Sequence, residues 1–260
     1  AEIGINHMGS MDKAKKLIDA ASRSGVDAVK FQTYITEKRA PKDNPQIFDI
    51  LKKCELPFKC FKELKDYSDS KNIEFFSTPF DQESIDYLKS MGITKHKIAS
   101  FDVTNHSLLK YISNNSDNII MSTGMANIDE VNKAYKILKK GKIQNISLLH
   151  CVSAYPTKEI DANLNVIKTL KDNFPQCVIG HSDHTPDIKV PLYAVACGAE
   201  IIEKHFMIEP DCVDAPVSIN EEQMSNLVLE VRLLEKIMGK ESLGMTKAQE
   251  GTKIFRRYGR

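Results

Sequence analysis

Two lysines lie inside segments whose other residues are mostly apolar, which is the pattern of buried β-strands. They are Lys30 and Lys97. A buried ammonium group is costly unless it is paired, so each lysine requires an anion close by. That anion could be a structural carboxylate, such as Glu2 or Glu203, or a group on a bound substrate. Other expected strands end near hydroxyl donors of the kind that surround a phosphate, at Thr78, Ser100, Ser122 and Ser182.

Two histidines come at the ends of neighbouring expected strands. His184 follows the segment 178–182, and His205 lies in the segment 201–206. Imidazole nitrogens at adjacent strand ends can bind one divalent metal ion, although this spacing matches no local zinc motif. A packed, hydrogen-bonded pair is the alternative. We expect structural roles for the others, with His96 and His106 at the surface or a helix edge and His150 and His181 in the core.

The elements that must position these residues alternate along the chain. The expected strands are 2–5, 27–34, 73–77, 96–100, 118–122, 146–151, 178–182 and 201–206. The expected helical segments are 10–25, 58–70, 81–92, 105–114, 127–141, 163–173, 187–197 and 220–238. Eight such pairs predict an α/β fold, a (β/α)8 TIM barrel spanning residues 1–240. A doubly wound sheet is the rival, but it usually has fewer strands and the first strand lacks G-x-G-x-x-G.

A barrel enzyme places its chemistry where the strands end, at the C-terminal face. In this chain polar side chains come at or just after the end of every expected strand. The barrel therefore predicts one polar site to which all eight strands contribute. The connection 35–57 is too long for an ordinary βα loop, and we expect either an active-site lid or a disordered excursion.

Composition narrows the class of protein. The 260 residues are 42% hydrophobic and 27% charged, which excludes a disordered, collagen-like or coiled-coil chain. The net charge of +1 disfavours a nucleic-acid-binding protein. The chain contains neither an apolar run of membrane-spanning length nor a signal-peptide pattern, so we expect no membrane association. Six cysteines without C-x-x-C spacing predict reduced, mostly buried thiols and a cytoplasmic protein.

Nine short motifs resemble, in order, those of the N-acetylneuraminate (sialic acid) synthase family. That family also contains legionaminate and pseudaminate synthases and a spore-coat polysaccharide protein. Each motif is weak alone, but together they span nearly the whole chain. The motifs lie at 1–7, 29–33, 76–81, 97–100, 122–125, 149–151, 155–156, 182–185 and 202–206.

The resemblance implies a phosphoenolpyruvate-dependent condensation. Such enzymes join phosphoenolpyruvate to the open-chain aldehyde of an N-acetylated hexosamine, with Mn²⁺ or Mg²⁺, giving a nine-carbon 2-keto acid and phosphate. The resemblance implies His184 and His205 as metal ligands. It implies catalytic roles for Glu2, Lys30, Tyr155 and Asp214, with Glu2 in proton transfer. It implies substrate contacts for Lys30, Thr78, Lys97, Ser100, Asp102, Ser122, Ser153 and Ser182.

Departures from the family pattern leave the acceptor sugar open. Asp102 stands where the sialic acid synthases usually have Glu, and Ser153 where they often have Asn. The stretch 99–102 resembles the pseudaminate branch more than the neuraminate branch. The resemblance therefore implies N-acetylmannosamine or a diacetamido-trideoxyhexose as the acceptor.

The resemblance also leads to a prediction for the last residues of the sequence. We expect residues 241–260 to begin a linker towards a C-terminal antifreeze-like domain that this chain lacks. In the family an Arg of that domain reaches the partner subunit's active site, so the resemblance implies a homodimer for the full-length protein.

Two other functions remain open. A Schiff-base aldolase would use Lys30 or Lys204 as nucleophile, and that lysine would have to be neutral. The hydroxyl groups expected around the lysines argue against it. A non-catalytic or sugar-binding barrel scaffold is the other possibility. The pair His184 and His205, together with Glu2 and Lys30, argues against a mere scaffold.

Overall fold

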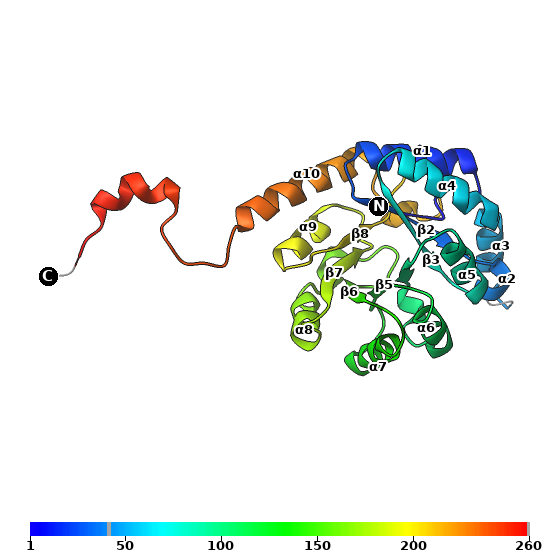
Figure 1. Cartoon of the computed structure of the whole chain (residues 1–260). Coiled ribbons are helices and arrows are strands. Elements are labelled where there is room, and N and C mark those ends of the chain that lie inside the picture. Colours follow the sequence, from blue (N-terminus) through cyan, green and yellow to red (C-terminus); the bar gives the residue numbers. More distant parts are fainter. Residues whose placement is uncertain (41–42, 259–260) are drawn as a thin grey trace.

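The strands of this protein lie side by side in one sheet, in the same order as along the chain. The computed structural model describes residues 1–40 and 43–258. The parallel strands are β1 (Glu2–Gly4), β2 (Ala28–Thr33), β3 (Glu74–Pro79), β4 (Lys95–Ile98), β5 (Asn118–Ser122), β6 (Asn145–Cys151), β7 (Val178–Asp183) and β8 (Ile202–Lys204). A parallel bridge between Glu2 and His205 brings the two ends of the sheet together. The fold is the predicted (β/α)8 barrel (Figure 1).

Helices surround this sheet, as Figure 1 shows. They are α1 (Met11–Arg23), α2 (Thr36–Arg39), α3 (Pro45–Cys54), α4 (Phe58–Ser70), α5 (Gln82–Ser90), α6 (His106–Ile112), α7 (Ile128–Lys139), α8 (Val166–Asn173), α9 (Lys189–Ala196) and α10 (Glu221–Met238). Short 3₁₀ segments are η1 (Ser100–Asp102), η2 (Glu159–Asp161), η3 (Ala215–Val217) and η4 (Lys247–Phe255). The predicted elements agree with these bounds to within a few residues.

Side-chain caps explain where several helices begin. Ser10 accepts a hydrogen bond from the N–H of Lys13 at the start of α1, and Asp81 does the same for Ser84 at the start of α5. At α7 the side chain of Asn127 and that of Glu130 form a capping box. Each cap follows a strand, so it also sets where the strand-to-helix loop at the open end of the barrel stops.

Strand residues alternate between the barrel interior and the helical layer. In β2, Val29 and Phe31 are fully buried in the core beneath the helices, whereas Lys30 lines the interior. In β4 the same alternation turns Lys97 inward and buries His96, whose Nδ1 lies 2.8 Å from Ser116 Oγ. The expectation that His96 is a surface or helix-edge residue is therefore wrong, because a covered sheet buries both faces of its strands.

The other expected structural groups partly follow prediction. His150 and His181 are buried and hydrogen-bonded, as expected for core histidines. The six cysteines are free thiols, but only Cys54 and Cys151 are buried, so the prediction that most of them are buried is wrong. Cys197 differs from expectation because it is exposed.

The long connection after β2 is ordered over its described residues. It contains α2 and α3, and it packs a small apolar cluster that includes Ile5, Tyr34, Leu51 and Cys54. The disordered alternative is therefore wrong for this part of the chain. Its expected role as a lid stays a prediction, but the segment does bring one side chain, Arg39, into the site described below.

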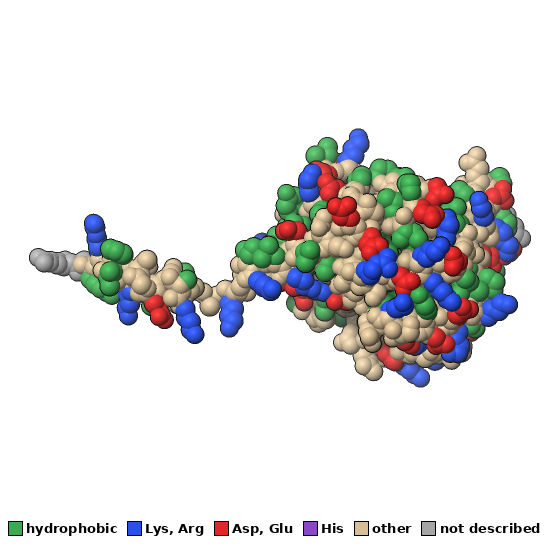
Figure 2. All heavy atoms as spheres, turned by 90° about the horizontal axis from the view of Figure 1, so that it is seen from above, with side chains coloured by type: hydrophobic (Ala, Val, Ile, Leu, Met, Phe, Trp, Pro, Cys, Tyr) green, Lys and Arg blue, Asp and Glu red, His purple; other side chains and the backbone are tan. Residues whose placement is uncertain are grey.

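The residues after α10 run away from the barrel (Figures 1 and 2). They include η4, and their side chains are exposed. That this segment begins a linker stays a prediction, and its last two residues lie outside the described part. On the face seen in Figure 2, acidic and basic side chains are interspersed. Within 1–40 and 43–258, no helix combines the length and apolar character needed to cross a bilayer.

Candidate active site

The C-terminal ends of the strands enclose a cavity of about 210 Å³, which we name the barrel mouth. Most of the predicted site residues line it: Glu2, Lys30, Thr78, Lys97, Ser100, Ser122, Tyr155, Ser182, His184, His205 and Asp214. It is also lined by residues absent from the predicted set, among them Gln32, Arg39, Phe80, Phe101, Cys151 and Glu203. Asp102 and Ser153 are not among the lining residues. The fold thus gathers residues from distant parts of the sequence into one polar cavity.

The two strand lysines are paired with carboxylates. Lys30 Nζ lies 2.6 Å from Glu2 Oε2 and 3.7 Å from Glu203 Oε2, and it donates a 3.1 Å hydrogen bond to Thr78. Lys97 Nζ lies 3.4 Å from Glu203 Oε1. The structural-carboxylate alternative left open by the sequence is therefore realised. Because Glu203 lies between both lysines, it pre-positions two cations for an anionic ligand.

Hydroxyl groups complete this charged cluster. Lys97 Nζ donates to Ser122 Oγ at 2.7 Å, and Ser182 Oγ donates to Glu203 Oε1 at 2.7 Å. These hydroxyls and ammonium groups sit on β4, β5 and β7, so the donors surround one side of the mouth. Such a set of donors suits a phosphate group.

Burial and charge determine the protonation of this cluster. Burial opposes the charge on Lys30, but attraction to Glu2 and Glu203 outweighs it and raises the lysine pKa. Burial lowers the pKa of Lys97, against the attraction of Glu203. Burial alone would raise the pKa of Glu203, but the two lysines hold that pKa well below its usual range. The carboxylate is ionised, and Lys30 is a poor candidate for a neutral Schiff-base nucleophile.

Lys204, the other candidate nucleophile, lies away from the mouth. Its Nζ is 2.7 Å from Asp183 Oδ2, and it also donates to the carbonyl of Thr185. Lys204 is 1% exposed, so its side chain joins β7 to β8 inside the protein. These contacts argue against both Lys30 and Lys204 as the nucleophile of a Schiff-base aldolase.

The two histidines lie next to each other, with ring centroids 5.4 Å apart. His184 Nδ1 donates to the carbonyl of Val152 at 2.8 Å, which leaves Nε2 as the nitrogen with a free lone pair. His205 Nδ1 lies 3.2 Å from Asp214 Oδ2. A backbone carbonyl or carboxylate behind each imidazole is the usual arrangement around metal-binding histidines. The residues present therefore fit a divalent metal held by two imidazoles.

The histidine environment also affects their charge. Burial lowers the pKa of His184 to about 4, so its imidazole is neutral, as a metal ligand must be. Burial would lower the pKa of His205 as well, but attraction to Asp214 raises it. Within the described ranges, groups of three or more His, Cys, Asp or Glu side chains suited to a metal are absent. Substrate and water would have to supply the remaining ligands.

Ser100 and Ser153 flank a tight loop after β5. Ser100 Oγ accepts a 3.0 Å hydrogen bond from the N–H of Gly124. A Cβ atom at Gly124 would lie 2.9 Å from Ser100 Oγ and 2.3 Å from Ser153 Oγ, so any larger residue would displace these hydroxyls. The buried Ser153 Oγ has no hydrogen-bond partner among the described residues. Ser153 lines a neighbouring cavity of about 600 Å³, and its role in substrate binding stays a prediction.

The carboxylate of Asp102 is hydrogen-bonded to a residue nearby in the sequence. Its Oδ1 accepts a 2.9 Å hydrogen bond from Asn105 Nδ2, at the start of α6. Burial raises the pKa of Asp102. It lies near the mouth without lining it, so a direct sugar contact stays a prediction for this residue.

Three of the lining residues missing from the predicted set, Gln32, Glu203 and Arg39, were missed for different reasons. Gln32 lies two positions after Lys30 on the same face of β2, and it donates to Glu2 Oε1 at 3.0 Å. The period of two along a strand could have found it. Glu203 was considered only as a structural partner. Arg39 comes from the long connection, where no periodic pattern marks a residue as facing a site.

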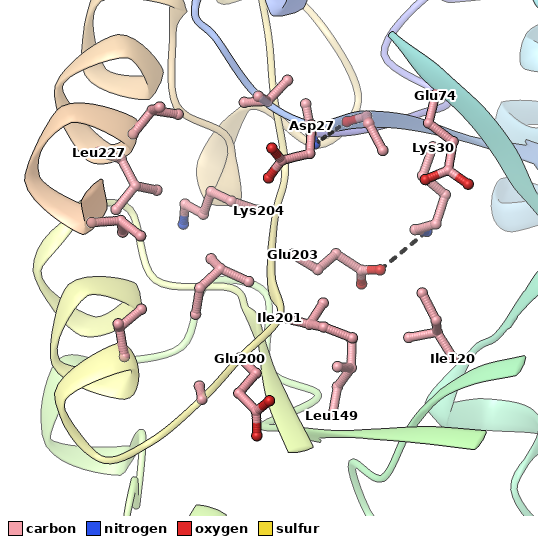
Figure 3. Close-up of a pocket in the computed structure, with 18 of the residues that line it drawn as sticks. Asp27, Lys30, Glu74, Ile120, Leu149, Glu200, Ile201, Glu203, Lys204 and Leu227 are labelled. Atoms are coloured by element: carbon pink, nitrogen blue, oxygen red, sulfur yellow. Dashed lines mark hydrogen bonds and ion pairs between the residues drawn. The ribbon is translucent and has the colours of Figure 1, made fainter. Parts of the chain in front are cut away.

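A second cavity, of about 300 Å³, lies at the other end of the barrel. Figure 3 shows it between strand starts and α10, with Asp27, Glu74 and Leu227 around it and Glu203 reaching across to Lys30. Barrel enzymes use the C-terminal face, where the histidines and hydroxyls lie. The barrel mouth is therefore the candidate active site.

A protein-family model matches the sequence over most of the chain. The model of the NeuB family covers residues 17–243. The chain belongs to the NeuB family. This NeuB-family chain is 40% identical to an N,N'-diacetyllegionaminic acid synthase of Campylobacter jejuni, over 92% of this chain and 76% of that protein. It is 32% identical to a pseudaminic acid synthase of the same species, over 99% of this chain and 79% of that protein.

A solved structure shows the same likeness in three dimensions. The NeuB-family chain superposes with a TM-score of 0.94 on the N-acetylneuraminic acid (sialic acid) synthetase of Leptospira borgpetersenii, crystallised with citrate. The sequences are 40% identical, and the match covers 98% of this chain and 90% of that chain. The chain is therefore an enzyme of the sialic acid synthase type.

Proposed function

We propose that this enzyme condenses phosphoenolpyruvate with the open-chain aldehyde of an N-acetylated amino sugar. The products are a nine-carbon 2-keto acid and inorganic phosphate. The observation that carries the proposal is the pair Lys30 and Lys97, held with Ser122 and Ser182 beside two histidines in the mouth of a NeuB-family barrel.

The charged cluster fits the donor substrate. Phosphoenolpyruvate carries a carboxylate and a phosphate, and both require cationic or hydroxyl donors. In the mouth, Lys30 already donates a hydrogen bond to Thr78, and Lys97 donates one to Ser122. We assign the phosphate to these groups together with Ser100 and Ser182.

His184 and His205 would hold a divalent metal ion, Mn²⁺ or Mg²⁺. When bound, the ion supplies Lewis-acid polarisation of the sugar aldehyde oxygen. Asp214 would orient His205 from behind, at the 3.2 Å separation seen here. Tyr155, whose ring centroid lies 4.1 Å from that of His184, would cover the ligand side of the site.

The bond changes follow from these positions. The electron pair of the C2–C3 π bond forms the new C–C bond from C3 to the aldehyde carbon, which leaves C2 positive. The aldehyde C=O π pair moves onto its oxygen, which takes a proton from solvent. Water then bonds to C2, and we assign its proton to Glu2, which Lys30 and Gln32 hold in the mouth. The new C2 hydroxyl then loses its proton to solvent and becomes the keto carbonyl, while the C2–O bond to the phosphate breaks and the phosphate leaves with the electron pair.

The acceptor sugar is the part of the proposal with several candidates. The chain is 40% identical both to a legionaminic acid synthase and to a sialic acid synthetase. N-acetylmannosamine and the two diacetamido-trideoxyhexoses that lead to legionaminate and pseudaminate therefore all belong in the test.

Quaternary structure and location are parts of the same proposal. We infer a homodimer and a cytoplasmic location, where phosphoenolpyruvate is available. Light scattering of the purified protein would test the first, and a mass of one chain only would contradict it.

The first experiment measures phosphate release from phosphoenolpyruvate with MnCl₂ and each of the three sugars in turn. Release with one sugar, dependent on both substrates, is the expected result. Release with none of the three would overturn the proposal in favour of a non-catalytic or sugar-binding scaffold. Borohydride trapping of a Schiff base at Lys30 would instead support the aldolase.

A further inference from the structure

Arg39 brings a guanidinium group to the barrel mouth from outside the strands. It is the last residue of α2, in the long connection after β2. Its Cζ lies 3.8 Å from the ring centroid of Phe80 and 4.5 Å from that of Tyr34. Both aromatic contacts hold the guanidinium plane in place by cation–π attraction. The side chain is therefore positioned before any ligand arrives.

Among the described residues, no carboxylate contacts this guanidinium, whereas each of the two lysines is paired with one. Its Nη1 is buried without a hydrogen-bond partner among residues 1–40 and 43–258. Asp214, Glu2 and Asp102 attract it from beyond contact distance. Lys30, by contrast, touches Glu2 at 2.6 Å. A buried N–H donor left unsatisfied is costly, so the geometry calls for an acceptor supplied by a ligand.

The acceptor that fits is a neutral oxygen on the sugar. Asp214, Glu2 and Asp102 attract Arg39 from a distance, but burial outweighs this attraction and lowers the arginine pKa, so an acceptor on a ligand would stabilise its charge. The anionic groups of the donor have nearer partners in Lys30 and Lys97. Two exposed aromatic rings, Phe101 and Tyr155, line the same cavity and offer apolar faces to sugar C–H groups and an acetyl methyl.

We propose that Arg39 binds the acceptor sugar, donating hydrogen bonds to an amide carbonyl or hydroxyl oxygen of the N-acetylated hexosamine. This inference deepens the proposed function and rests on it. A planar guanidinium can donate two parallel hydrogen bonds, so it would fix the orientation of the sugar as well as its affinity. Arg39 is then a residue that determines acceptor specificity.

The test compares Arg39→Met with Lys38→Met in steady-state kinetics. Lys38 is the neighbouring residue on α2; it is exposed and paired with Glu83 outside the mouth. We expect Arg39→Met to raise the KM for the sugar by about 10- to 100-fold, the loss typical of hydrogen bonds from a charged donor. The KM for phosphoenolpyruvate should change less than about twofold, and Lys38→Met should match the wild type.

Arg39→Lys adds a second measurement. It keeps the charge and loses the planar fork, so an intermediate sugar KM is expected. An unchanged sugar KM in Arg39→Met would overturn the inference. So would a rise confined to the KM for phosphoenolpyruvate, because that would assign Arg39 to the donor. Equal thermal unfolding midpoints for the variants would show that the effect is local.

Direct sugar binding separates this inference from the proposed function. Saturation-transfer NMR of the acetyl methyl signal, with MgCl₂ and the same three sugars, does not require turnover. If the wild type binds a sugar without releasing phosphate, the reaction is wrong, and loss of the signal in Arg39→Met alone still supports the Arg39 contact. If the wild type binds none of the sugars, the inference about Arg39 is wrong too.

Discussion

At the scale of single residues, three basic groups of the mouth are each paired with a carboxylate. Lys30 has Glu2, Lys97 has Glu203, and His205 has Asp214. These partners adjust the charge and orientation of the groups that they contact. Asp214 is suited to a test because its backbone is held independently, by hydrogen bonds to Asn6 and Ser218. Changing its side chain should therefore leave the loop in place.

We predict that Asp214→Asn weakens Mn²⁺ binding about 10- to 100-fold, the cost usually seen when the group behind a ligand histidine is changed. An amide cannot hold the imidazole of His205 as a carboxylate does. Free Mn²⁺ would be measured by electron paramagnetic resonance. Asp211→Asn, an exposed acid in the same loop, is the matched control. Equal Mn²⁺ affinities for the two variants would contradict the metal assignment.

At the scale of elements, the barrel mouth depends on how closely neighbouring loops approach. The loop after β5 passes so near β4 and β6 that Gly124 has no room for a side chain. Its N–H also holds the hydroxyl of Ser100 at 3.0 Å. The position of one proposed phosphate ligand is therefore set by a loop from the next strand, and not by its own strand alone.

We predict that Gly124→Ala raises the KM for phosphoenolpyruvate about tenfold or more, the loss of roughly one charge-assisted hydrogen bond. The new methyl would displace Ser100 and Ser153. Combining it with Ser153→Ala removes the shorter of the two clashes and should recover part of the loss. Gly251→Ala, whose added Cβ meets nothing within 4 Å, serves as control. A wild-type KM in Gly124→Ala would refute this account.

At the scale of the whole molecule, covering both faces of the sheet buries histidines that have no role in the mouth. Burial lowers the pKa of His96 to about 4, below its ordinary value of 6.5. His7 and His150 are shifted in the same direction, also to about 4 and also by burial. Between pH 6.5 and about pH 4 the unfolded chain binds more protons than the folded one, so the free energy of unfolding must fall as the pH falls.

We predict that His96→Gln makes the free energy of unfolding depend less steeply on pH. Between pH 6.5 and pH 4 the slope should fall by about 1.4 kcal/mol per pH unit, the contribution of one histidine. The measurement is the free energy of unfolding from urea titrations at several pH values. Above pH 7 the histidine is neutral in both states, so there the variant should differ from the wild type by a constant. Parallel curves over the whole range would count against a neutral, buried His96.

Local patterns in the sequence were enough to predict the strands, the helices around the barrel and the barrel itself, but not α2 and α3 in the long connection after β2. Alternation of apolar runs and amphipathic runs is a short-range property, and caps such as Asn127 act within one turn. Most residues of the mouth followed from the same pattern, because parallel strands of a barrel all end on one face. His96 was misplaced because its side chain faces the helical layer, whose depth no local pattern reveals.

Other features were decided by tertiary structure alone. Whether Lys30 faced a structural carboxylate or only a substrate depended on closing the sheet, which brings Glu203 to within 3.7 Å of it from the far end of the chain. Arg39 entered the mouth because α2 packs its guanidinium against Phe80. The sequence by itself determined which groups were available and on which elements they lie. Their partners, and hence their charge, were decided only when distant segments came into contact, because electrostatic interactions depend on separation in space and on burial.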